Sequence, residues 1–192
     1  MNKLKIKVIL GSTRPNRFGI QPANWILDAA KKVENFEAEL IDLKDYPMPF
    51  FEEEVGPSYI KEPYANPAVA AFTKKMEEAD GFIMITPEYN HAPSAVLKNA
   101  LDYVYKEWAH KPVAIASYGS VGGARAIELL RLSVIELQMV PIKRSIHLTN
   151  HWANLDEKGI LNFGPYQHQL EPLLKDLEWW SRILKEAREK IN

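Results

Sequence analysis

Apolar residues along the chain follow two different periods. Short apolar or alternating runs occupy residues 4–10, 38–43, 81–86, 112–117 and 140–148, which is typical of strands. Apolar residues at helical spacing fill residues 20–33, 66–79 and 123–137 and recur from Leu170 to Leu184. A further helix is expected after residue 93, with one apolar face formed by Leu97, Leu101, Val104 and Trp108.

Strands that alternate with helices predict an α/β fold with one parallel sheet and helices on both faces. Right-handed crossovers favour a flavodoxin-like three-layer sandwich with strand order 2-1-3-4-5. No repeat or linker divides residues 1–192, so a single domain is expected. The proline-rich stretch 43–66 is interpreted as a loop, and Asn66 followed by Pro67 indicates a helix start.

Composition narrows the possible functions. A formal net charge of −1 argues against a dedicated nucleic-acid or anionic-membrane binder, which usually carries a basic excess. No apolar run is long enough for a membrane span, and the first strand is a poor signal peptide, so a cytoplasmic location is expected. The absence of cysteine excludes disulfides, thiolate nucleophiles and iron–sulfur clusters. Any electron chemistry therefore needs a bound cofactor.

Three polar loops follow the first, third and fourth predicted strands, at the sheet edge where such folds bind ligands. The first loop, residues 11–19, reads GSTRPNRFG and leads into a helix. Its glycines, hydroxyls and arginines suit a phosphate, although it is neither a dinucleotide fingerprint nor a P-loop. The alternative is a tight capped loop with exposed arginines.

The second loop, residues 86–93, reads TPEYNHAP, and the third, residues 117–126, reads SYGSVGGARA. An aromatic ring among amide groups suits a flat heterocycle, and clustered glycines permit its close approach. Each loop taken singly is also consistent with an ordinary cap or a flexible turn. At one sheet edge, the three together predict a phosphate anchor facing a platform for rings, which describes a mononucleotide site.

These three motifs, with PEYNHAPSAVLKNALDYVYKEW as the most specific, resemble the NADPH-dependent FMN reductases across about residues 4–138. That group is flavodoxin-like and includes quinone, chromate and azo-dye reductases. The resemblance implies bound FMN, with Ser12, Arg14 and Arg17 at its phosphate. The whole expected FMN site comprises Gly11, Ser12, Thr13, Arg14, Arg17, Phe18, Gly19, Pro87, Glu88, Tyr89, Asn90, Ser117, Tyr118, Gly119, Gly122 and Gly123.

The resemblance also implies an activity. NADPH or NADH would reduce FMN and leave before a quinone, flavin, azo or similar acceptor binds, in a ping-pong order, without a catalytic side chain. A flavodoxin-type electron carrier and a flavin-binding module without turnover are the alternatives. The family usually forms homodimers or homotetramers, and Phe50, Phe51 and Tyr59 in the 43–66 stretch are interface candidates, while a loose surface loop is the competing interpretation. His147 and His151 lack the converging ligands that a metal site needs.

Overall fold

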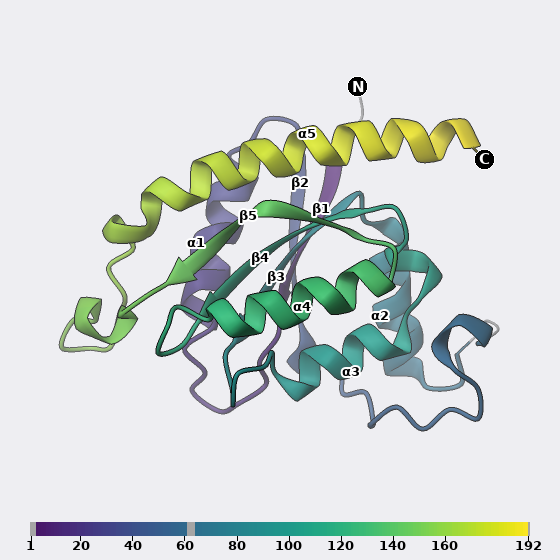
Figure 1. Ribbon diagram of the computed structural model, residues 1–192, viewed down its shortest axis with the longest axis horizontal. Helices are drawn as coiled ribbons and strands as arrows, with labels where there is room; N and C mark the ends of the chain where they lie inside the picture. The colour runs from purple at the N-terminus through teal and green to yellow at the C-terminus, as the bar shows by residue number, and fades with distance from the viewer. Residues whose placement is uncertain (1–2, 61–63, 192) are drawn as a thin grey trace.

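The computed structural model describes residues 3–60 and 64–191, which form one sheet between two helical layers (Figure 1). Its five strands are parallel and lie in the order β2-β1-β3-β4-β5, which confirms the predicted fold class and strand order. The strands are β1 (Leu4–Leu10), β2 (Phe36–Asp42), β3 (Gly81–Pro87), β4 (Pro112–Tyr118) and β5 (Val140–Leu148). The α-helices are α1 (Ile20–Lys31), α2 (Pro67–Glu78), α3 (Ala95–Tyr103), α4 (Ala124–Glu136) and α5 (Gln167–Ile191).

Two apolar cores lie on opposite faces of the sheet. Helices α1 and α5 cover one core, and α2, α3 and α4 cover the other. Along β3 the side chains alternate between the cores: Ile83 and Ile85 join the first, and Phe82 and Met84 the second. Burial on both faces explains why β3 and β4 are continuously apolar in sequence. None of the described helices has the length and apolarity to cross a membrane.

The predicted elements differ from the structure mainly at their ends. The second strand begins at Phe36 instead of residue 38, and several helices are one or two residues shorter than expected. The expectation that Val104 and Trp108 lie on the third helix is wrong, because α3 ends at Tyr103. Both side chains are nevertheless fully buried, and Trp108 packs on Phe82 with ring centroids 4.9 Å apart. Their apolar character reflects burial in the second core after the helix has ended.

Part of the 43–60 segment is anchored to α3. The Asn99 side chain accepts a hydrogen bond from the Phe51 N–H at 2.9 Å and donates one to the Pro49 carbonyl at 2.7 Å. The Tyr103 hydroxyl donates to the Phe50 carbonyl at 3.2 Å. The interpretation of this part as a loose loop is therefore wrong. Phe51 packs against the second core, whereas Phe50 and Tyr59 are exposed, and residues 61–63 lie outside the described residues.

The predicted cap of α2 is confirmed. The Asn66 side chain accepts hydrogen bonds from the N–H groups of Ala68 at 2.9 Å and Val69 at 3.3 Å. We expect Asn66→Ala to lower the free energy of unfolding by about 1 kcal/mol, because these N–H groups lose their acceptor. Urea denaturation measures the loss, and Asn66→Asp, which keeps the acceptor, should retain most of the stability. Equal losses in the two variants would contradict this role.

Candidate functional site

The first and second loops meet where β1 and β3 end. The Gly11 N–H donates to the Ile85 carbonyl at 2.8 Å, and the Ser94 hydroxyl donates to the Gly11 carbonyl. A Cβ at position 11 would lie 2.8 Å from the Ile85 oxygen, so only glycine fits this approach. Further out, the Arg14 guanidinium donates to the Tyr89 hydroxyl at 3.2 Å, and its Cζ lies 5.7 Å from the Tyr89 ring centroid.

The first loop presents hydrogen-bond donors that the protein does not use. The Ser12 hydroxyl is buried and completes no hydrogen bond of good geometry among the described residues, although it lies near enough to the Tyr118 hydroxyl to oppose the rise that burial causes in the pKa of that phenol. From Ser12 to Arg17, no backbone N–H donates to another backbone group in the described chain. The helix α1 that follows begins after Gly19 without a side-chain cap and without an acidic residue in its first turn. Free N–H groups beside a helix N-terminus fit a phosphate group.

Arg17 has a different environment from Arg14. Its guanidinium forms an ion pair with Asp42, the last residue of β2, and both side chains are largely buried. Arg17 therefore ties the first loop to the edge of the sheet, and its charge is already matched by a carboxylate. Arg14 is exposed, and its hydrogen bond with Tyr89 raises the pKa of the guanidinium. Of the two predicted phosphate ligands, Arg14 is the one whose cation has no acidic partner in the described chain.

A tight turn projects part of the second loop from the sheet edge. Tyr89 and Ala92 exchange backbone hydrogen bonds of 2.9 and 3.0 Å. Between them, Asn90 and His91 have φ values of 49° and 69°, the left-handed conformations of a two-residue hairpin turn. Tyr89, Asn90 and His91 are consequently exposed. The phenol ring of Tyr89 thus stands at the surface beside the first loop.

Glu88, by contrast, turns its carboxylate away from that surface toward the start of α4. There it accepts hydrogen bonds from the Arg125 Nε at 2.6 Å and from the backbone N–H groups of Arg125 and Ala126 at 3.1 and 3.4 Å. Burial opposes ionisation of this carboxyl, but these hydrogen bonds outweigh it and hold the pKa of Glu88 below its usual value. Its side chain therefore caps a helix.

The third loop brings its backbone close to neighbouring segments. Gly119, Gly122 and Gly123 have φ values of 155°, 66° and 74°. A Cβ at Gly119 would lie 2.9 Å from the Glu88 Cβ. At the strand end before these glycines, Ser117 donates to the Thr86 carbonyl at 2.7 Å. The second and third loops are therefore in direct contact.

The first and third loops meet through aromatic rings. The Phe18 and Tyr118 centroids lie 4.9 Å apart, edge to face, and the Tyr118 hydroxyl lies against Gly19. Burial is the main cause that raises the pKa of the Tyr118 phenol, and the nearby Tyr89 hydroxyl raises it further. Because its ring is buried here, Tyr118 would contact a ligand mainly through its backbone. His151 follows β5, and its ring lies tilted against Phe18 with centroids 4.5 Å apart; burial lowers the pKa of its imidazole.

The three predicted loops thus touch one another in every pair. Sequence reasoning missed the residues that hold them together: Asp42 for Arg17, Arg125 for Glu88 and His151 for Phe18. Each lies in another part of the chain from its partner. The only available sequence signal was charge, since a buried Glu or Arg beside a strand end needs a counter-ion.

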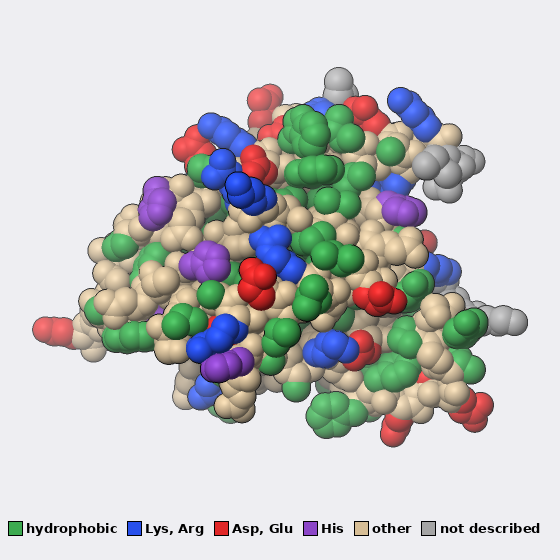
Figure 2. Space-filling model, in the orientation of Figure 1, with side chains coloured by type: hydrophobic (Ala, Val, Ile, Leu, Met, Phe, Trp, Pro, Cys, Tyr) green, Lys and Arg blue, Asp and Glu red, His purple; other side chains and the backbone are tan. Residues whose placement is uncertain are grey.

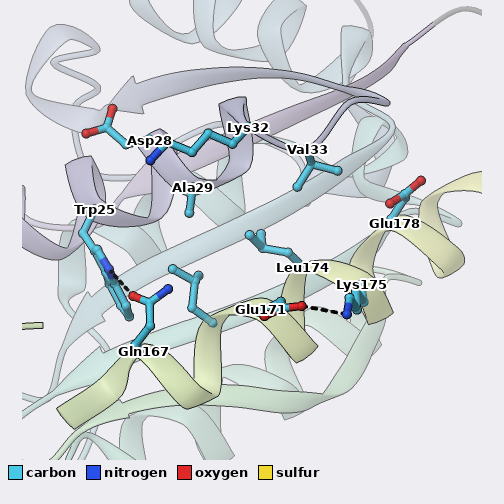
Figure 3. A pocket seen from close by; sticks show the side chains of 11 residues that line it. Trp25, Asp28, Ala29, Lys32, Val33, Gln167, Glu171, Leu174, Lys175 and Glu178 are labelled. Atoms are coloured by element: carbon cyan, nitrogen blue, oxygen red, sulfur yellow. Dashed lines mark hydrogen bonds and ion pairs between the residues drawn. The ribbon is translucent and has the colours of Figure 1, made fainter. Parts of the chain in front are cut away.

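Three hollows of the described structure lie away from these loops. A groove of about 570 Å³ separates α1 from α5 and is lined by Trp25, Val33, Leu174 and flanking charged residues (Figure 3). Two smaller hollows lie beside β5 and around residues 153–162. None is bordered by the free donors of the first loop. We place the candidate site at the loops because unused donors indicate a ligand more specifically than volume does.

Comparison with known proteins decides the family. The family model described as NADPH-dependent FMN reductase matches residues 4–153. The chain belongs to this family. Its members are oxidoreductases that work with FMN and NAD(P)H, and the protein is one of these enzymes.

Individual relatives agree with the family. An NAD(P)H-dependent FMN reductase of Schizosaccharomyces pombe is 39% identical over 127 residues, which cover 66% of this chain and 64% of that protein. An NADPH:quinone oxidoreductase of Arabidopsis thaliana is 35% identical over 85% of this chain and 78% of its own length. The fold is similar to that of FerB, a flavoenzyme NAD(P)H:(acceptor) oxidoreductase of Paracoccus denitrificans, with a TM-score of 0.73, 19% identity and coverage of 93% of this chain and 97% of that one.

Proposed function

We propose that the protein binds FMN at the edge where the three loops meet and passes hydride equivalents from NADPH or NADH to a quinone or similar acceptor. The observation that carries this proposal is the buried Ser12 hydroxyl, which completes no hydrogen bond of good geometry, among the free N–H groups of the loop that leads into α1. Ser12, Thr13 and Arg14 would hold the FMN phosphate. The second and third loops would border its ring system.

Bound FMN would supply the redox chemistry, because the chain has no cysteine and hydride transfer is the chemistry of a flavin. The contribution of the third loop is electrostatic. Its Ser120, Val121 and Gly123 N–H groups donate no hydrogen bond to another backbone group in the described chain. They can therefore stabilise negative charge on a neighbouring ring without a charged side chain. No proton-transfer residue is required.

The exposure of this edge supports a proposal for the order in which the substrates bind. Tyr89 and Asn90 are exposed beside the site, so the nicotinamide and the acceptor would reach the same opening. We propose that they use it in turn, which gives ping-pong kinetics. A quinone is the favoured acceptor class, because the exposed phenol ring of Tyr89 suits a flat molecule and a relative is a quinone oxidoreductase. A flavin or azo compound has the same planar chemistry.

We also propose that the protein is a homodimer or homotetramer. Helix α4 buries Leu130 and Val134 but also exposes Leu129, Leu132 and Ile135 on its outer side. Hydrophobic side chains lie among charges of both signs on the face that Figure 2 shows. A helix that is apolar on both sides is usually covered. Sedimentation velocity measures the oligomeric state.

The function is tested by the visible spectrum of the FMN-loaded protein and its response to NADPH without oxygen. Flavin absorption that bleaches on addition, and returns when a quinone is added, is the expected result. Parallel lines in double-reciprocal plots would support the ping-pong order. A flavin-loaded protein that reacts with neither NADPH nor NADH would instead be an electron carrier. Failure to bind FMN would overturn the proposed site.

Removal of the Arg14 cation should weaken FMN binding. We expect Arg14→Ala to raise the FMN dissociation constant about tenfold, because a charge-assisted hydrogen bond to a phosphate contributes about 1.5 kcal/mol or more. Quenching of FMN fluorescence measures the constant. Lys31→Ala, which removes an exposed cation at the far end of α1, is the control. Equal affinities for Arg14→Ala and wild type would remove Arg14 from the phosphate site.

A further inference from the structure

Glu88 is buried between the two loops that we expect to border the FMN ring. Its side chain is 3% exposed. One carboxylate oxygen accepts from the Arg125 Nε at 2.6 Å, and the other accepts from the backbone N–H groups of Arg125 and Ala126 at 3.1 and 3.4 Å. All the hydrogen bonds that this carboxylate accepts in the described structure therefore come from the first turn of α4.

The start of α4 needs an acceptor from elsewhere in the chain. Its N-cap, Gly123, has a left-handed backbone and makes no side-chain cap. The first N–H groups of a helix lack partners within the helix, and the positive end of the helix dipole favours a carboxylate. Glu88 supplies that carboxylate from the second loop, across 37 residues of sequence. The second loop thus caps the helix that follows the third loop.

Further contacts hold the third loop to Glu88 along its length. At the start of the loop, the Glu88 N–H donates to the Tyr118 carbonyl at 2.9 Å. In the middle, Gly119 approaches so closely that a Cβ there would lie 2.9 Å from the Glu88 Cβ. Arg125, held by Glu88, also donates to the Ser120 hydroxyl at 3.2 Å. Glu88 therefore links the second loop to the third loop through both its backbone and its side chain.

We propose that Glu88 is a positioning residue, whose buried carboxylate sets the spacing between the two loops that border FMN and makes no contact with FMN itself. This inference rests on the proposed function. It assigns Glu88 a role different from that implied by sequence resemblance, which places the residue along the flavin ring. The backbone of the loop can still border the ring, while the side chain determines where the facing loop lies.

Glu88→Gln tests the role, because it keeps the shape of the side chain but removes its negative charge and replaces one of its two acceptor oxygens with a donor. Glu128→Gln is the matched control, since it neutralises an exposed carboxylate on the same helix. In the FMN-free protein, amide hydrogen exchange at Arg125 and Ala126 reports the cap directly. We expect faster exchange at both amides in Glu88→Gln, and a FMN dissociation constant about tenfold above that of wild type, as for loss of a hydrogen bond to a charged group.

Arg125→Ala provides a second route should Glu88→Gln fail to fold. It removes the guanidinium but leaves the two backbone donors, so a smaller rise in the FMN dissociation constant is expected. Where both variants fold, the double variant should bind FMN no more weakly than Glu88→Gln alone, because the two residues act through one contact. A merely structural role would lower stability without changing FMN affinity at a temperature where the protein is folded.

The outcomes separate this inference from the proposed function. Unchanged exchange at the two α4 amides in Glu88→Gln would show that the helix start does not need the negative charge of the carboxylate, and would overturn the inference. Faster exchange with wild-type FMN affinity would overturn it too, because the cap would not shape the site. In both cases FMN binding by the wild-type protein would leave the proposed function intact. Failure of the wild-type protein to bind FMN would overturn both.

Discussion

Replacement of Ser12 by aspartate is expected to abolish FMN binding. Ser12 is 2% exposed, and its hydroxyl completes no hydrogen bond of good geometry in the described structure. A carboxylate at this position would take up the free N–H donors and place a negative charge against the phosphate. Two like charges about 4 Å apart repel by about 4 kcal/mol at the dielectric typical of a protein surface, which weakens binding about a thousandfold.

Fluorescence titration with FMN gives the dissociation constants of wild type, Ser12→Asp and two comparison variants. Ser12→Ala removes one hydrogen bond without adding charge, so a loss of about tenfold is expected. Ser58→Asp adds the same charge at an exposed position of the 43–60 segment and should leave FMN affinity unchanged. A folded Ser12→Asp protein that binds FMN as tightly as wild type would place the phosphate elsewhere.

The fold was predictable from the sequence because its strongest signals are periodic. β3 and β4 are buried at every position, so their runs of apolar residues predicted interior strands of a parallel sheet. The Asn66–Pro67 pair predicted the start of α2 for a local reason, since a cap depends on neighbouring residues. Trp108 was misplaced because helical spacing and burial produce the same apolar pattern after a helix has ended.

The candidate site was predictable as a set of loops but not in its side-chain directions. Parallel strands place their carboxyl ends at one edge, so the convergence of the three loops follows from strand order. Strand order does not, however, predict the ion-pair partners of Arg17 and Glu88. Asp42 is 25 residues from Arg17, and Arg125 is 37 residues from Glu88. Many other charged residues lie at comparable separations, so only the packed structure selects these pairs.

The candidate site contains two kinds of residue, those with unused donors and those whose charges are matched within the protein. Ser12 and Arg14 have donors without acidic partners in the described structure, and they are therefore available to a ligand. Arg17 and Glu88 are ionised side chains whose charges are matched inside the protein, and they therefore hold the loops in place. Both kinds appear together in the family's motifs. A motif residue thus identifies the site without revealing whether it touches the cofactor.

Replacement of Gly123 by alanine is expected to cause the largest loss of stability at this edge. Gly123 has a φ of 74°, and an added Cβ would lie 1.9 Å from the Ser117 hydroxyl oxygen and 2.9 Å from the Tyr118 backbone nitrogen. Ser117 is fully buried in β4 and cannot easily move. The strained backbone costs about 1 kcal/mol or more, and the overpacking adds about 1–3 kcal/mol. We expect the free energy of unfolding to fall by about 3 kcal/mol, measured by urea denaturation.

Gly159 provides a control with the same backbone conformation but open surroundings. Its φ is 75°, and an added Cβ would meet no atom within 4 Å. Gly159→Ala should therefore lose only the conformational contribution, about 1 kcal/mol. The difference between the two variants isolates the contact of Gly123 with Ser117. Because α4 begins at the next residue, Gly123→Ala should also displace the third loop and weaken FMN binding, whereas Gly159→Ala should not. Equal losses of stability would show that backbone strain alone, and not the close approach to β4, requires glycine at position 123.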